Sequence, residues 1–109
     1  MALGPKSYSP LGLKKQRIDL AYAEGLAAEG LGFLADDESR LIRFMSETGM
    51  DPSALFKSAG TRDVLLAVLD HIGNDESLLL VFAASRSIKP ETVMEAALLL
   101  QGRPYERST

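Results

Sequence analysis

The sequence predicts an all-α fold, a compact bundle of about six helices built from two pseudo-symmetric halves. Two observations predict this fold class. Apolar residues recur at helical spacing between residue types that begin and end helices, and the chain resembles itself after a shift of 38 residues. No segment reads as a strand, because none combines β-type composition with strict alternation of apolar and polar residues.

The composition is that of one ordinary globular domain, with 109 residues of which 46% are hydrophobic and 25% charged. The absence of cysteine excludes disulfides, thiolate metal sites and catalytic thiols. The longest apolar run covers residues 78–84, whereas a membrane-spanning helix needs roughly 20 apolar residues. Residues 1–12 lack the apolar region of a secretory signal. We therefore expect a cytoplasmic protein that does not contact a membrane.

Charge is distributed unevenly along the chain, whose net charge is −3. Residues 1–17 contain four basic residues and no acidic one, and residues 18–102 contain six basic and fourteen acidic residues. We expect residues 1–14 to form a flexible arm, residues 15–102 the helical domain, and residues 103–109 a frayed tail. A basic arm on an acidic body can contact the body itself, a partner or nucleic acid.

The first predicted helix covers residues 15–35, with helically spaced apolar residues that include Ile18, Tyr22, Leu26 and Phe33. Small residues form a stripe along this helix at Ala21, Gly25, Ala28 and Gly32. Glycine inside a helix costs about 1 kcal/mol relative to alanine. We therefore expect a neighbouring helix to approach closely and offset the cost of the three glycines, Gly25, Gly30 and Gly32.

Each of the next three helices is predicted between a residue that caps or opens it and a glycine that ends it. The pairs are Asp36 and Gly49, Asp51-Pro52 and Gly60, and Thr61 and Gly73. The residues expected to face the core are Leu41, Ile42, Phe44 and Met45 in the second helix, Leu55 and Phe56 in the third, and Val64, Leu65, Val68, Leu69 and Ile72 in the fourth.

The fifth predicted helix, residues 74–88, contains the most apolar run of the chain. Asn74 is expected to cap it, and Asp75 and Glu76 favour its positive N-terminal end. A helix that is apolar on all sides must be enclosed by other elements, so we expect it to be the central helix of the bundle. Pro90 opens a sixth helix that extends to about Gln101.

The internal repeat relates residues 31–59 to residues 69–97, where eight of twenty-nine positions are identical. The identities include helix starts and core positions, so we expect two three-helix halves, about residues 22–60 and 61–101, that close on each other. Phe44 and Phe82 are then equivalent core residues. Arg43 in the first half is replaced by Val81 in the second, which predicts a half-exposed second helix and an enclosed fifth one.

These elements resemble a family of short uncharacterised proteins, seen mainly in alphaproteobacteria and classed as a domain of unknown function. The matching segments are Phe33-Leu34-Ala35-Asp36, Arg43-Phe44, Thr48-Gly49, Pro52, Leu55, Ala67-Val68-Leu69-Asp70, Asp75-Glu76, Leu78-Leu79, Phe82-Ala83 and Pro90. They cover roughly residues 20–97, and Val64-Leu65 depart from the more aromatic start expected for that helix. The resemblance implies a shared fold and a bacterial cytoplasmic protein, and it implies no activity.

Catalytic, cofactor-binding and metal-ligating residues are not predicted. His71 lies near the end of a helix, where the helix dipole favours it, and no nucleophile is spaced to work with it. The acidic residues Asp36, Asp37, Glu38, Asp75 and Glu76 are explained as caps and first-turn residues rather than as metal ligands. The glycines are not in a phosphate-binding motif. We expect a protein that is not an enzyme and has no cofactor.

Two functions in other classes are open. The preferred one is protein–protein interaction, with a protein partner or as a homo-oligomer such as a dimer, because the sixth helix has apolar residues on more than one face. Its candidate interface residues are Met94, Leu98 and Leu99. The alternative is DNA binding by a helix-turn-helix-like unit around Gly49. Because few cations lie in that unit, the candidate nucleic-acid contacts are Lys14, Lys15, Arg17 and Lys57.

Overall fold

The computed structural model describes residues 18–102, and within them it shows six helices and no strand. This confirms the predicted all-α fold. The helices are α1 (Leu20–Ala35), α2 (Glu38–Thr48), α3 (Pro52–Ser58), α4 (Arg62–Gly73), α5 (Glu76–Arg86) and α6 (Pro90–Leu100). The predicted arm and tail, and the first residues of the predicted first helix, lie outside the described residues.

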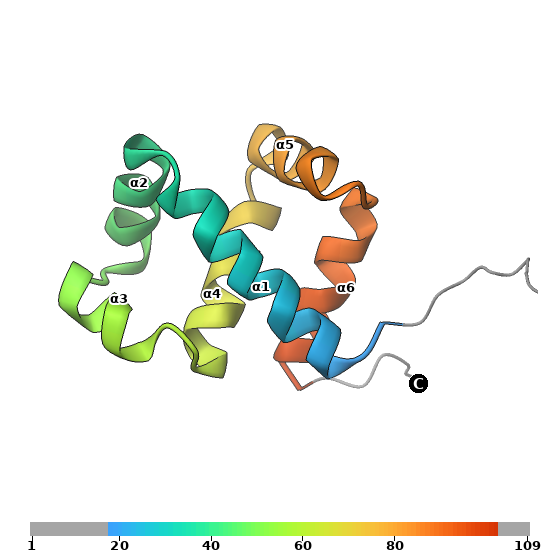
Figure 1. Cartoon of the computed structure of the whole chain (residues 1–109), viewed down its shortest axis with the longest axis horizontal. Coiled ribbons are helices and arrows are strands. Elements are labelled where there is room, and N and C mark those ends of the chain that lie inside the picture. The colour runs from blue at the N-terminus through green and yellow to red at the C-terminus, as the bar shows by residue number, and fades with distance from the viewer. Residues whose placement is uncertain (1–17, 103–109) are drawn as a thin grey trace, which may run out of the picture.

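The centre of the bundle is α1, which crosses the molecule in front of α4 (Figure 1). It packs on α4 and α6 along most of its length and on α2 near its end. The largest fully buried side chains come from five helices: Leu34, Phe44, Val68, Leu69, Ile72, Phe82, Val93 and Leu100. Burial of these side chains is the main favourable contribution to folding.

The prediction that residues 74–88 form the central helix is wrong, since α5 lies at the periphery (Figure 1). Its backbone lies closest to α4 and α6, and it also contacts α1 through Phe82 and Arg86. Only Phe82 and Ala83 of α5 are buried, whereas Leu80 and Val81 are 51% and 49% exposed. A continuous apolar run shows that a helix has no polar side, but it does not show that every side is covered. The fifth helix is therefore half exposed.

A neighbouring helix was expected to approach α1 closely at Gly25, Gly30 and Gly32. Of these three glycines, only Gly30 has such a contact. A Cβ atom on Gly30 would lie 2.9 Å from Val68 Cγ1 and 3.1 Å from Ile72 Cδ1, so α1 and α4 touch there. No atom lies within 4 Å of a Cβ on Gly25 or Gly32. The predicted stripe is wrong as a contact surface, because its four residues, Ala21, Gly25, Ala28 and Gly32, are all exposed.

Three helix starts differ from those predicted, and in each case the cap is an aspartate whose carboxylate accepts backbone N–H groups. Asp19 accepts from Tyr22 N, so α1 begins at Leu20 rather than near residue 15. Asp37 caps α2, whereas Asp36 ends α1 and donates its backbone N–H to Gly32 O. Likewise Asp75 caps α5, and the residue before it, predicted as the cap, ends α4. An N-cap needs both a side-chain acceptor and an extended backbone. In the pairs Asp36-Asp37 and Asn74-Asp75, only the second residue has both.

The other boundaries agree closely with those predicted. Gly49 follows α2 with φ 76°, Asp51 caps α3 before Pro52, Thr61 caps α4, and Pro90 opens α6. Ile42, predicted to face the core, is instead 54% exposed. The helices α2 and α5 begin 38 residues apart, as do α3 and α6. Whether the two halves are related by pseudo-symmetry stays a prediction.

Candidate interaction surfaces

The predicted partner interface lies on α6, whose two sides differ sharply. Val93, Ala96, Ala97 and Leu100 form its buried side. On the opposite side Met94 and Leu98, four residues apart and therefore on one face, are 45% and 39% exposed. Leu99, the third predicted residue, is half-buried and packs against the core. We call the exposed pair Met94 and Leu98 the α6 patch.

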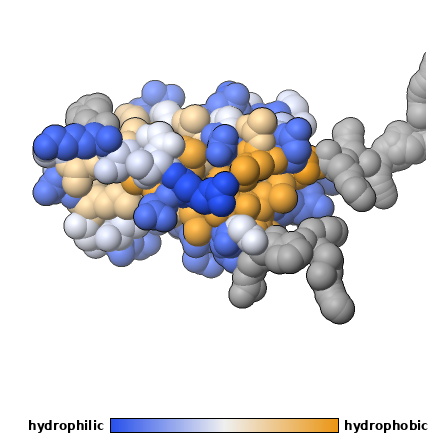
Figure 2. Space-filling view, turned by 90° about the horizontal axis from the view of Figure 1, so that it is seen from below, coloured by the Kyte–Doolittle hydropathy of each residue, from blue (hydrophilic) through white to orange (hydrophobic). Residues whose placement is uncertain are grey.

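The α6 patch lies beside the end of α4 and is bordered by carboxylates. A Cβ on Gly73 would be 3.1 Å from Met94 Sδ, so the thioether lies directly over the last residue of α4. Glu91 is exposed and Glu95 is half-buried, and the spacing of both residues places them on the α6 face that carries Met94 and Leu98. On the molecular face shown in Figure 2, apolar atoms gather in the half that carries α6 and the start of α1.

A second exposed apolar face lies on α5, and the sequence reasoning missed it. Its members are Ser77, Leu80, Val81 and Ala84, all exposed and none charged. Their spacing places them in one stripe along the helix. We call this stripe the α5 outer face. The signal for it was present in the sequence as an uninterrupted apolar run, which was interpreted as core.

Two contacts determine which side of α5 faces inward. Phe82, fully buried, packs its ring 5.1 Å from the ring of Phe33 on α1. Arg86 Nη1 lies 3.1 Å from Glu29 Oε1, which joins the end of α5 to the middle of α1. Phe82 and Arg86 are four residues apart and share the inner side, so the α5 outer face must point away from the bundle.

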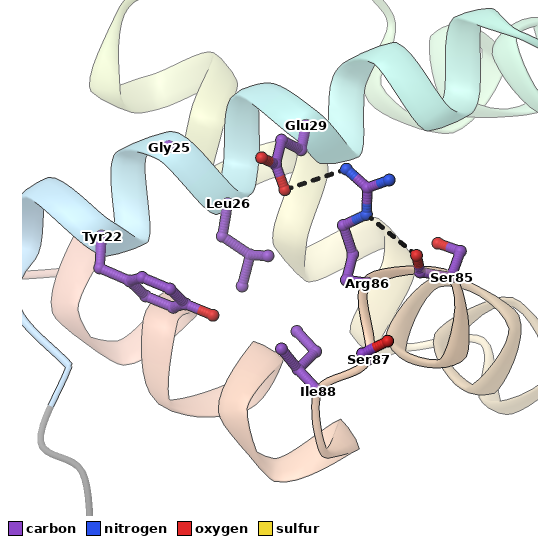
Figure 3. Close-up of a pocket in the computed structure, with 8 residues that line it drawn as sticks. All are labelled: Tyr22, Gly25, Leu26, Glu29, Ser85, Arg86, Ser87 and Ile88. Carbon is purple, nitrogen blue, oxygen red and sulfur yellow. Dashed lines mark hydrogen bonds and ion pairs between the residues drawn. The ribbon is translucent and has the colours of Figure 1, made fainter.

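A groove of about 460 Å³ lies between α1 and the connection from α5 to α6 (Figure 3). The Tyr22 ring and the side chains of Leu26 and Ile88 give it apolar walls, and the Arg86–Glu29 ion pair closes one end. Gly25 also lines the groove and leaves open space where a side chain would project. The groove is open to solvent, and its lining is part apolar and part polar.

A smaller polar pocket of about 390 Å³ contains the single histidine. His71 is buried, its Nδ1 lies 3.0 Å from Glu47 Oε1, and the Phe44 ring packs against it edge-on with 5.3 Å between centroids. Nδ1–H therefore donates to Glu47 and joins α4 to α2. The other ring nitrogen, Nε2, is buried and has no hydrogen-bond partner among the described residues. These contacts hold α4 against α2, and neither Glu47 nor Phe44 is a nucleophile that His71 could activate.

Asp70, beside His71 in the last turn of α4, has a raised pKa. Desolvation raises the pKa of its carboxyl above the ordinary value of 3.8, although the residue as a whole remains exposed. A carboxylate near the C-terminal end of a helix also faces the negative end of the helix dipole. Residues 18–102 contain no group of three or more His, Cys, Asp or Glu side chains arranged to hold a metal ion.

The nucleic-acid contacts proposed under the alternative are mostly outside the described part of the chain. Lys14, Lys15 and Arg17 fall there, and Lys57 is exposed in the last turn of α3. The predicted glycine corner exists, with Gly49 in the left-handed conformation between α2 and α3. The backbone of α3 lies farther from the other helices than theirs lie from one another, although its Leu55 is buried in the shared core, as a helix-turn-helix unit also requires.

The fold and surfaces together define a small all-α bundle with apolar side chains exposed on several helices, among them α5 and α6. A family model described as "Protein of unknown function (DUF3572)" matches residues 21–103, and the chain belongs to this family. The resemblance to a domain of unknown function is thereby confirmed. No curated protein and no solved structure matches the chain. None of the helices in residues 18–102 has the length and apolar character needed to cross a membrane.

Proposed function

We propose that this protein is a small interaction module that binds another protein through the α6 patch and acts without catalysis or a cofactor. The observation that supports the proposal is the exposure of Met94 and Leu98 on a helix whose other side is buried in the core. Covering such side chains with a partner removes apolar surface from water, which is the main driving force of most protein associations.

The charges around the α6 patch indicate the chemistry of the partner. Glu91 and Glu95 lie on the same face, and residues 18–102 carry fourteen acidic against six basic residues. A partner with an apolar centre flanked by lysine or arginine would complement both features. Long-range attraction would also speed its association, and this part of the effect would weaken at high salt.

The test is affinity capture of the tagged full chain from an extract of its own cells, with nuclease present. The extract is incubated separately with the immobilised wild-type protein, a Met94→Lys/Leu98→Lys variant and an Ile42→Lys control. Ile42 is the matched control because it is an apolar residue, 54% exposed, on α2, a helix that lies at the other end of the molecule from α6 (Figure 1). Circular dichroism of all three proteins establishes that they are folded.

The expected result is a protein captured at defined stoichiometry by the wild type and by Ile42→Lys, and lost with the α6 variant. The proposal fails if the α6 variant captures the same protein equally well. It also fails if the material recovered without nuclease is nucleic acid that disappears with nuclease and at high salt, which would favour the DNA-binding alternative.

A further inference from the structure

We propose that the α5 outer face pairs with the same face of a second copy of this chain, with the two α5 helices antiparallel. The proposal rests on the proposed interaction function and adds to it a named partner for a different helix. The observation that carries it is the composition and order of the α5 outer face, which are self-complementary.

The α5 outer face has the same order of small and large side chains from either end of the helix. Its two large apolar residues, Leu80 and Val81, lie at the centre and are 51% and 49% exposed. A small residue, Ser77 or Ala84, follows at either end of the stripe. In a two-fold symmetric pair centred between residues 80 and 81, Leu80 of one copy faces Val81 of the other, and Ser77 faces Ala84. The small residues let the helix axes approach to about 8–10 Å.

The charges along α5 favour the antiparallel over the parallel arrangement. The helix begins after Asp75 with Glu76, and the exposed Lys89 lies just beyond its end, whereas Arg86 points to the inner side and pairs with Glu29. Antiparallel pairing brings the acidic start of one helix beside the basic end of the other and also aligns their helix dipoles favourably. Parallel pairing would place like charges side by side. The stripe between these ends carries no charge, so nothing in it has to be desolvated at high cost.

The corresponding face of α2 shows what a solvated version of this surface looks like. A shift of 38 residues places Ile42 and Arg43 at the positions of Leu80 and Val81. Arg43 is 65% exposed in its side chain and lies 3.6 Å from Glu47, its partner four residues on. The α2 face therefore has a charge in the middle, whereas α5 has a valine there, and the exposed part of that valine contributes nothing to folding.

The size of the face sets the strength of the pairing. A stable dimer usually buries about 800 Å² on each partner, which is more than one side of a helix of 11 residues supplies. We therefore infer a weak, reversible dimer that forms as the protein concentration rises. Sedimentation equilibrium of the full chain, from micromolar to millimolar protein, is the measurement suited to it.

Val81→Arg is the decisive variant, because it gives α5 the residue that α2 already exposes at the corresponding position. It should weaken the dimer at least about tenfold by placing two charges in the apolar interface. Ile42→Lys and Met94→Lys are the controls, and both should dimerise like the wild type. Retention of partner capture by Val81→Arg would separate this inference from the function proposed for the α6 patch.

The orientation is tested by disulfide cross-linking, for which the chain is suited because it contains no cysteine. A mixture of Ser77→Cys and Ala84→Cys proteins should form the mixed disulfide under mild oxidation, since only opposed residues come within disulfide distance. Each variant alone should cross-link far less. Faster cross-linking of Ser77→Cys with itself would overturn the antiparallel arrangement. A wild type that stays monomeric throughout, or a Val81→Arg variant that dimerises equally well, would overturn the pairing itself while leaving the α6 proposal intact.

Discussion

Substituting the glycines of α1 by alanine separates the one close helix contact from the positions where glycine has no packing role. At Gly30 the new methyl group would lie 2.9 Å from Val68 Cγ1 and 3.1 Å from Ile72 Cδ1. Both neighbours are fully buried, and the γ-carbon of a helical valine cannot easily turn away. Overpacking of this kind costs about 1–3 kcal/mol, against which alanine gains about 1 kcal/mol in helix propensity.

Gly30→Ala should therefore lower the free energy of unfolding by about 1 kcal/mol. Gly25→Ala is the matched control in the same helix, since nothing lies within 4 Å of its Cβ position. It should raise the free energy of unfolding by about 0.4–1 kcal/mol. Urea unfolding followed by circular dichroism gives both values, and the two melting temperatures should differ by roughly 10 °C. A Gly30→Ala protein as stable as Gly25→Ala would refute the close packing of α1 on α4.

Three further predictions concern stability. Glu47→Ala should lower the free energy of unfolding by about 1 kcal/mol, because it removes the hydrogen-bond acceptor of His71. In a His71→Leu background the same substitution should change it very little. Equal changes in the two backgrounds, measured by urea unfolding, would show that the two side chains are not coupled. Asp70→Asn should stabilise the protein by a few tenths of a kcal/mol, about the size of a helix-dipole term, at pH 7 and not below pH 3.8. The raised pKa means that the folded state binds a proton more tightly, so wild-type stability falls as pH rises above 3.8 through the folded pKa; an Asn variant less stable than wild type at pH 7 would contradict this. Ser87→Gly should raise the free energy of unfolding by about 0.5 kcal/mol, because Ser87 has a left-handed φ of 59° that glycine adopts without strain. An unchanged midpoint of thermal unfolding would refute that reasoning.

The helices themselves were predictable because their ends are determined by neighbouring residues. Pro52, Pro90 and Gly49 act through their own backbone preferences, and the structure places each where the sequence predicts it. Each cap that was placed one residue early lies in a pair of adjacent cap-forming residues, such as Asp36 and Asp37. Residue type alone cannot choose within such a pair, since the choice depends on backbone conformation.

The candidate surfaces were predictable only in part. On α6 the apolar residues cover more than one side, which was enough to expect an exposed patch of Met94, Leu98 and Leu99; Met94 and Leu98 are exposed, whereas Leu99 is half-buried against the core. On α5 an equally strong apolar signal was interpreted as a core helix, and Leu80 and Val81 were missed. The groove beside Tyr22 combines residues about 60 positions apart in the sequence, so no local pattern could indicate it.

The sequence by itself determined that the chain is all-α, where most of its helices begin and end to within a residue or two, and which residues of α4 form its inner face. These properties follow from capping, from proline and glycine, and from helical periodicity, all of which act within a few residues. The tertiary structure alone decided that α1 rather than α5 is central and which side of α5 faces water. A helix with apolar residues all round carries no information about its orientation, so that choice depends on distant contacts, namely the packing of Phe82 on Phe33 and the pairing of Arg86 with Glu29.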